Sequence, residues 1–186
     1  MAVAITSMTA AEYLATPESR PEHTELINGT VIVNEPKIPH ARIQLVIAHR
    51  LEIWIEQGEG RGYVGLPADI VIDDRNVFAP DLWWVSEDRR PAPDQPDLAG
   101  RPDLVVEIRS PSTWTRDLAV KLPAYESTGV AEAWFVDTDA ATVMVFRRTR
   151  PTAETFDVRL EVGGDEPLAS PLLPGFPLSP RAIFGR

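Results

Sequence analysis

The sequence contains no cysteine, which excludes disulfide bonds and thiolate metal sites. Any metal ion must therefore be held by oxygen ligands or by one of the three histidines. No stretch approaches the roughly 20 apolar residues of a membrane-spanning helix. The N-terminal sequence MAVAITSM also lacks the basic start and the long apolar core of a signal peptide. These absences predict a cytoplasmic protein that has no membrane partner.

Positive charge is scarce. The chain has 18 Lys and Arg against 28 Asp and Glu, for a net charge of −10. A protein that coats nucleic acid needs clustered Lys and Arg to bind phosphates, so this class is disfavoured. A nuclease stays compatible with the charge, because only its cleft has to be positive. Lysine is rarest of all: sixteen of the eighteen basic residues are arginine, and the lysines are Lys37 and Lys121.

The 186 residues fit one domain, 1–186, with a Pro-rich tail from about residue 165 that is expected to wrap the surface. Thr9 and Glu12 form a capping-box pattern that predicts a short helix over 10–15. Asn28-Gly29 lies between two alternating runs and predicts a hairpin. Apolar residues at helical spacing predict the main amphipathic helix over 38–56.

Short strand-like runs dominate the remaining sequence. Ser112 or Thr115 can cap a helix that runs to about Thr128, where Gly129 can end it. Pro123 inside this helix removes a backbone donor, so the turn around 119–123 should be irregular. The strand-like runs are GYVGL, ADIVID, VFAPDLWWV, PDLVVEIRS, AEAWFVDT, TVMVFRRT and ETFDVRLEV. This order predicts an α/β protein with a central mixed sheet flanked by helices.

Two carboxylates adjoin apolar strands: Asp81 precedes LWWV, and Glu107 follows LVV. Burying a carboxylate is costly unless it is paired, hydrogen-bonded or bound to a cation. Two such groups on neighbouring strands would form a hard-oxygen site suited to Mg²⁺. The alternative is that both carboxylates lie at wet strand ends and are simply solvated.

Three further residues have competing interpretations. Lys121 can form a surface ion pair with Asp117, four residues earlier, or its helix can fold back and deliver the ammonium to the acidic pair. Glu25, in the first hairpin, is either a third acid or a solvent-facing residue of an alternating strand. His40 precedes the long helix and is a candidate cap or phosphate-facing residue.

The segments PDLVVEIRSPSTWTRDLAVKLPAY and GVAEAWFVD resemble the signature of the Uma-type family of restriction endonucleases, within the PD-(D/E)XK nuclease superfamily. The similarity extends through ELINGTVI, His40 and APDLWWV, which is nearly the whole chain. It implies a restriction-endonuclease-like fold in which Asp81 is the motif aspartate, Glu107 the D/E position and Glu25 an accessory acid. The superfamily lysine position holds Arg109 instead, and Lys121 is then a migrated catalytic lysine.

The resemblance further implies a metal-dependent endonuclease that hydrolyses phosphodiester bonds, with DNA as its partner. One or two Mg²⁺ or Mn²⁺ ions would be held by Asp81, Glu107 and the backbone carbonyl of Ile108. Lys121 would orient or activate water, and Arg109, which cannot lose its proton, would only stabilise charge. Two alternatives remain open: an inactive nuclease-fold binding or assembly module, and a hydrolase of small phosphate esters. The sequence also leaves open whether the protein is a monomer or a homodimer.

Overall fold

The computed structural model describes residues 7–16, 23–95, 98–110 and 114–185. The first helix, α1 (Ala10–Leu14), begins with the predicted capping box. The Thr9 hydroxyl accepts from the Glu12 N–H, and the Glu12 carboxylate accepts from the Thr9 N–H. No helix among the described residues is both long enough and apolar enough to cross a membrane.

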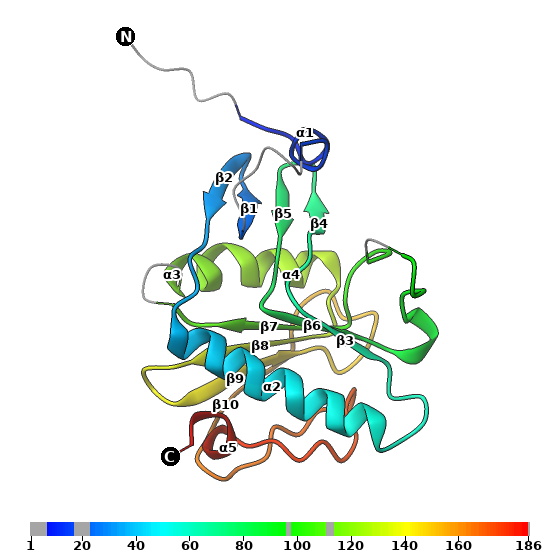
Figure 1. Ribbon diagram of the computed structural model, residues 1–186, viewed down its shortest axis with the longest axis vertical. Coiled ribbons are helices and arrows are strands. Elements are labelled where there is room, and N and C mark those ends of the chain that lie inside the picture. Colours follow the sequence, from blue (N-terminus) through cyan, green and yellow to red (C-terminus); the bar gives the residue numbers. More distant parts are fainter. Residues whose placement is uncertain (1–6, 17–22, 96–97, 111–113, 186) are drawn as a thin grey trace.

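The central sheet of the described residues has six strands in the order β10-β9-β8-β7-β6-β3 (Figure 1). Only its pair β7–β8 is parallel, so the sheet is mixed, and the predicted fold class is confirmed. The parallel pair is joined by the helices that follow β7, which cross over one face of the sheet. The strands are β3 (Tyr63–Gly65), β6 (Leu82–Val85), β7 (Leu104–Ile108), β8 (Glu132–Asp137), β9 (Thr142–Arg147) and β10 (Val158–Gly163).

A second, antiparallel sheet of four strands, in the order β2-β1-β5-β4, projects from the central sheet as an arm (Figure 1). The sequence did not predict this separate sheet. Its hairpin turn is the predicted one: Asn28 and Gly29 have φ values of 51° and 76°, as a tight two-residue turn requires. The strands are β1 (Thr24–Ile27), β2 (Thr30–Val33), β4 (Ile70–Asp73) and β5 (Asn76–Phe78).

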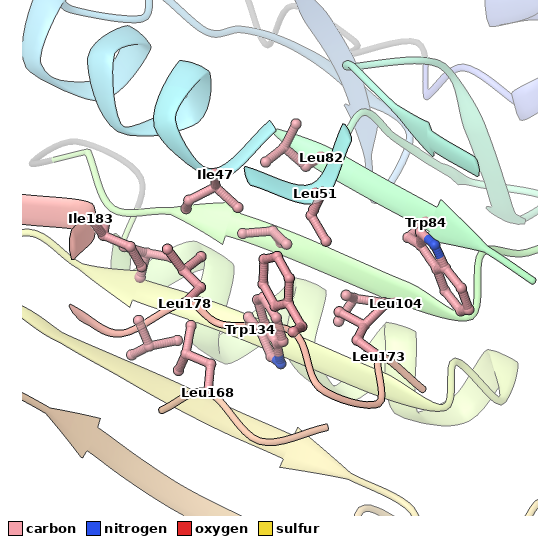
Figure 2. Close-up of a cluster of buried hydrophobic side chains, with 14 of the residues drawn as sticks. Ile47, Leu51, Leu82, Trp84, Leu104, Trp134, Leu168, Leu173, Leu178 and Ile183 are labelled. Atoms are coloured by element: carbon pink, nitrogen blue, oxygen red, sulfur yellow. The ribbon is translucent and has the colours of Figure 1, made fainter. Parts of the chain in front are cut away.

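Helix α2 (Ile38–Glu56), as predicted from its periodicity, covers one face of the central sheet (Figures 1 and 2). The C-terminal tail shares this core, so the prediction that it wraps the surface was wrong. Between its prolines the tail places Leu168, Leu173, Phe176, Leu178 and Ile183 into the core, and it ends with α5 (Pro180–Phe184). Proline content predicts an irregular backbone, but it does not indicate whether the side chains between the prolines are buried.

The opposite face carries α3 (Trp114–Arg116), a π-helical turn η3 (Asp117–Lys121) and α4 (Leu122–Thr128). The expected irregularity is this π-helical turn, in which the Leu122 N–H donates to the Asp117 carbonyl five residues back. Gly129 ends α4 with φ of 82°, as predicted. Thr115 lies inside the helix rather than at a cap, and Ser112 lies outside the described residues.

Candidate functional site

Strand register brings Asp81 and Glu107 together. Strands β6 and β7 are antiparallel, and Leu82 pairs with Val106. Asp81 is one residue before Leu82 and Glu107 is one residue after Val106, so the two are neighbours across the sheet. The predicted adjacency on one mixed sheet is confirmed.

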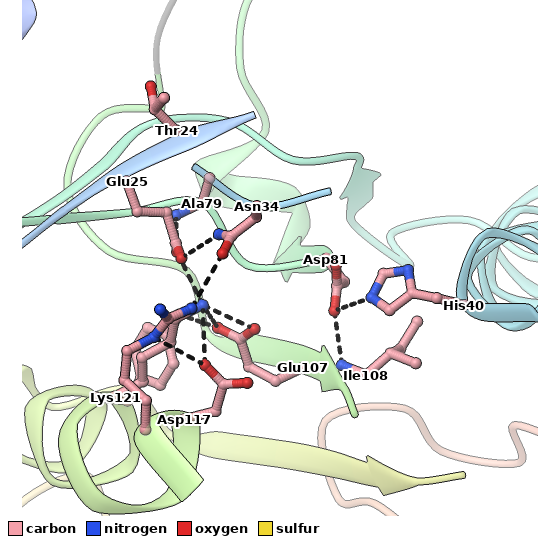
Figure 3. Close-up of polar contacts among 12 residues, drawn as sticks. Thr24, Glu25, Asn34, His40, Ala79, Asp81, Glu107, Ile108, Asp117 and Lys121 are labelled. Atoms are coloured by element: carbon pink, nitrogen blue, oxygen red, sulfur yellow. Dashed lines mark hydrogen bonds and ion pairs between the residues drawn. The ribbon is translucent and has the colours of Figure 1, made fainter. Parts of the chain in front are cut away.

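Lys121 lies at the centre of a buried acidic cluster (Figure 3). Its Nζ is 2.8 Å from Glu25 Oε1, 3.1 Å from both Glu107 carboxylate oxygens, and 3.6 Å from Asp117 Oδ1. None of the four side chains is more than 4% exposed. The ammonium therefore points inward, and the surface interpretations of Lys121 and Glu25 are wrong. The Asp117 pair does form, but inside the protein.

The spacing of four residues explains how Asp117 and Lys121 both face inward. The π-helical turn ends at Lys121 and α4 continues to Tyr125, so Asp117, Lys121 and Tyr125 lie on one side of the helix and all three are buried. The Tyr125 hydroxyl donates to Glu107 Oε1 at 2.6 Å. Sequence reasoning assigned no role to Tyr125, although its spacing from Lys121 is the signal that could have found it. Single-turn π segments of this kind are frequent at functional sites.

The electrostatics of this cluster favour added positive charge. Burial alone would lower the pKa of Lys121, but the charges of Glu107, Glu25 and Asp117 raise it above its ordinary value. Burial, reinforced by the neighbouring carboxylates, raises the pKa of Glu107 well above its usual range, although the Lys121 ammonium opposes this. Burial and the charge of Glu107 likewise raise the pKa of Tyr125, which stays a hydrogen-bond donor. Three carboxylates thus share a single ammonium.

Asp81 is held by a separate set of contacts (Figure 3). Its Oδ2 accepts from the Ile108 N–H at 2.6 Å and lies 3.1 Å from His40 Nε2. His40 is in the first turn of α2, and Lys37 is the N-cap residue, so the expectation that His40 caps the helix was wrong. Burial favours the neutral ring, but the hydrogen bond and charge of Asp81 raise the pKa of His40 overall. Gln44 Nε2 donates to the Asp81 carbonyl at 2.8 Å.

Arg109 belongs to a different network. Its Nη1 donates to both carboxylate oxygens of Asp137, at 2.8 and 3.0 Å, and its Nη2 is 2.8 Å from Asp139 Oδ2. The guanidinium also lies 5.4 Å from the ring centre of Trp114. Arg109, which occupies the superfamily lysine position, therefore stabilises the turn between β8 and β9. Within the described residues, no ion pair joins Arg109 to Asp81 or Glu107.

A cavity of about 350 Å³ connects the two halves of the site. Asp81, Glu107, Ile108, Lys121 and His40 all line it. Among the described residues, no group of three or more His, Cys, Asp or Glu side chains is arranged to hold a metal ion. The donor set nevertheless fits Mg²⁺, which takes one or two carboxylates and fills its other positions with water and substrate phosphate.

Sequence comparison identifies the family of the chain. The Uma2 family, described as "Putative restriction endonuclease", matches residues 10–181. The chain belongs to the Uma2 family. A comparison with the curated proteins found no match.

A solved structure supports the fold of this Uma2 family member. It is described as a "putative nuclease belonging to DUF820" from Anabaena variabilis ATCC 29413. The two chains are 22% identical with a TM-score of 0.78, and the match covers 96% of this chain and 98% of the other. At this identity the likeness establishes the shared architecture, and the chemistry has to be argued from the site.

Proposed function

We propose that this protein is a metal-dependent endonuclease that hydrolyses phosphodiester bonds in DNA. The observation that carries the proposal is a buried ammonium, Lys121, bonded to Glu107 beside Asp81 at the wall of one cavity. Burying one lysine with several carboxylates costs desolvation energy, and such clusters concentrate at functional sites. Membership of the Uma2 family supports the same class of activity.

The proposed metal ligands are the carboxylates of Asp81 and Glu107 and the backbone carbonyl of Ile108. When bound there, Mg²⁺ or Mn²⁺ would polarise the phosphate and lower the pKa of a bound water. His40 and the Ile108 N–H fix the orientation of the Asp81 carboxylate. Tyr125 and Lys121 do the same for Glu107.

Lys121 has the role of a hydrogen-bond donor in this proposal. Because its pKa is raised, it stays protonated near neutral pH and cannot serve as the general base. Its ammonium can orient a water molecule and stabilise negative charge on the phosphate. Glu25 positions the ammonium, and is itself held by the Asn34 amide at 2.7 Å and the Ala79 N–H at 2.8 Å. Glu25 is thus the accessory acid of the site.

One observation favours a different function, a nuclease-fold binding module without catalysis. Both carboxylate oxygens of Glu107 already accept hydrogen bonds from Lys121, and one also accepts from Tyr125. A metal ion has to share these oxygens with the donors or displace them. The net charge of −10 is also typical of a protein that does not bind nucleic acid tightly.

Calorimetric titration with Mn²⁺ and cleavage of plasmid and single-stranded DNA test both functions. Wild type should bind Mn²⁺ and cleave, Asp81→Ala should lose both properties, and the control Asp165→Ala, which alters a 73% exposed side chain, should match wild type. Equal Mn²⁺ binding by wild type and Asp81→Ala would refute the metal site. A wild type that binds Mn²⁺ but cleaves neither DNA form would instead support the binding module.

A further inference from the structure

Three of the groups assigned to catalysis are almost completely buried in the wall of the cavity. Glu25, Glu107 and Lys121 are each at most 3% exposed. The cavity volume of about 350 Å³ is near the lower end of small-molecule pockets, which span roughly 300–1,000 Å³. Double-stranded DNA is stiff over about 150 base pairs, so its backbone does not bend sharply into a recess of this size without a large cost. The burial of these groups therefore favours a flexible, single-stranded nucleic acid as the substrate.

The charge of the cavity wall also argues against a duplex. Duplex binding depends on several Lys and Arg side chains that neutralise consecutive phosphates. Among the described lining residues, the side chains with a permanent positive charge are Lys121 and Arg116, and Lys121 is already surrounded by carboxylates. The acidic lining residues are Glu25, Glu35, Asp81, Glu107 and Asp117. Such a wall can hold one phosphate, with a metal ion present, far more easily than a row of them.

Arg116 is the second permanent positive charge of this wall. Its Nη2 donates to Asn34 Oδ1 at 3.0 Å, and the same Asn34 side chain donates to Glu25, so the guanidinium is tied to the acidic cluster. Its Nε is buried and lies 4.0 Å from Asp117 Oδ1, whereas the side chain as a whole is 25% exposed, so a ligand meets the outer part of the guanidinium. The N–H donors of a guanidinium match the geometry of phosphate oxygens.

The exposed lining of the cavity includes apolar side chains beside the charged Glu35. Val33, at the end of β2, is 52% exposed, and Leu66, directly after β3, is 61% exposed. Both line the cavity together with Pro36 and Pro67. Exposed aliphatic groups beside an acidic pocket gain nothing from a sugar-phosphate backbone, but they can cover the flat face of an unpaired base.

We propose that the cavity takes one unpaired nucleotide from a single-stranded or looped-out segment. Its phosphate meets Arg116 and the Asp81–Glu107 pair, and its base lies against Val33 and Leu66. A nucleotide inside a duplex keeps its base stacked and paired, and therefore reaches the site only after the base is turned out, which costs a few kcal/mol. This substrate class rests on the proposed nuclease function and deepens it.

The test compares three labelled DNA substrates of one sequence with Mn²⁺: a single strand, a fully paired duplex, and a duplex with a central unpaired loop. The single strand and the unpaired loop should be cleaved at least about tenfold faster than the duplex. Equal or faster cleavage of the paired duplex would overturn the inference.

A complete lack of cleavage would count against the nuclease function and leave the substrate class to be decided by binding. Fluorescence anisotropy with the same three molecules then gives the answer. Preferential binding of the single strand and the loop supports the inference, whereas equal binding of all three overturns it.

Variants of the exposed apolar lining give an independent test. Val33→Ser with Leu66→Ser should lower kcat/KM on the single strand by about tenfold, mainly by raising KM, since the base loses apolar contact. The matched control is Val71→Ser with Leu160→Ser, which alters two side chains that are 53% and 49% exposed and do not line the cavity. It should behave as wild type. If both double variants gave the same KM as wild type, no base would be bound against Val33 and Leu66.

Discussion

Replacing Lys121 by methionine removes the one ammonium of the buried cluster while keeping most of the side-chain volume. Three carboxylates, those of Glu25, Glu107 and Asp117, would lose a partner between 2.8 and 3.6 Å away. Breaking a buried ion pair by deleting one partner costs about 3–5 kcal/mol, because an uncompensated charge is left behind. The remaining hydrogen bond from Tyr125 to Glu107 limits the loss. We expect the free energy of unfolding to fall by about 3–5 kcal/mol near neutral pH.

The control is the other lysine of the chain. Lys37 is 72% exposed and pairs at 3.6 Å with Glu35, which is 80% exposed, so Lys37→Met should change stability by less than about 0.5 kcal/mol. Both variants are compared with wild type by urea unfolding in the presence of EDTA. The pair of substitutions separates the effect of burial from that of losing a lysine as such.

The difference in stability between wild type and the Lys121→Met variant should change with pH in a known direction. In wild type, burial already raises the pKa of Glu107 above its unfolded value of about 4.3 and the Lys121 ammonium opposes this rise, so Lys121→Met raises the pKa of Glu107 further. The native variant therefore loses more stability than wild type as pH rises through that window. In wild type the pKa of Lys121 is raised, so its contribution persists at every pH below its unfolded value of about 10.4.

The stability difference should therefore be smaller near pH 5 than near pH 8, by about 1 kcal/mol or more. A difference in the free energy of unfolding between wild type and Lys121→Met below about 1 kcal/mol at neutral pH would refute the conclusion that Lys121 is a buried, charged partner of the three carboxylates. A difference that does not change with pH would refute it as well.

Three other changes have expected outcomes. Tyr125→Phe removes a hydroxyl bonded to the Glu107 carboxylate and should cost about 1.5–3 kcal/mol by urea unfolding; a loss below about 0.5 kcal/mol would contradict the contact. Burial raises the pKa of Glu132, so its stabilising contribution is lost as pH rises from about 4.3 through that raised value. Glu132→Gln should accordingly lose less stability than wild type between about pH 5 and pH 8, and parallel curves would argue against a buried carboxyl. Arg109→Lys loses the bidentate contact with Asp137, which should lower the free energy of unfolding by about 1 kcal/mol. The variant should preserve or raise DNA cleavage. A folded variant without cleavage activity would show that position 109 takes part in the chemistry.

Local patterns located most of the secondary structure. The capping box at Thr9, the Asn28-Gly29 turn and the amphipathic helix over 38–56 all appear as expected, because each has a local signal in the sequence: a capping pair, a turn dipeptide or a helical period of apolar residues. Pro123 correctly indicated an irregular helix, since a missing N–H disturbs the same turn in any tertiary context. The tail was misjudged, because proline content describes the backbone and not which way the intervening side chains face.

The candidate site was predictable in part. Asp81 and Glu107 attract attention because each adjoins an apolar run, and the resemblance to the family gives them roles. The one sequence signal for Tyr125 is its four-residue spacing from Lys121, which an ordinary core tyrosine on an amphipathic helix would share. The 2.6 Å contact with a carboxylate on another element decides between these two interpretations.

The sequence by itself determined most of the helices and strands, the two acidic positions beside apolar runs, and the family to which the chain belongs. Only the tertiary structure decided that Lys121 turns inward while Arg109 turns toward Asp137, because both choices depend on charges that lie far away in the chain. Glu25 reaches Lys121 across almost a hundred residues, from the arm sheet, a separate layer of the molecule. Coulombic contacts of this kind depend on distance in space and leave no periodic pattern in the sequence, whereas hydrophobic periodicity does.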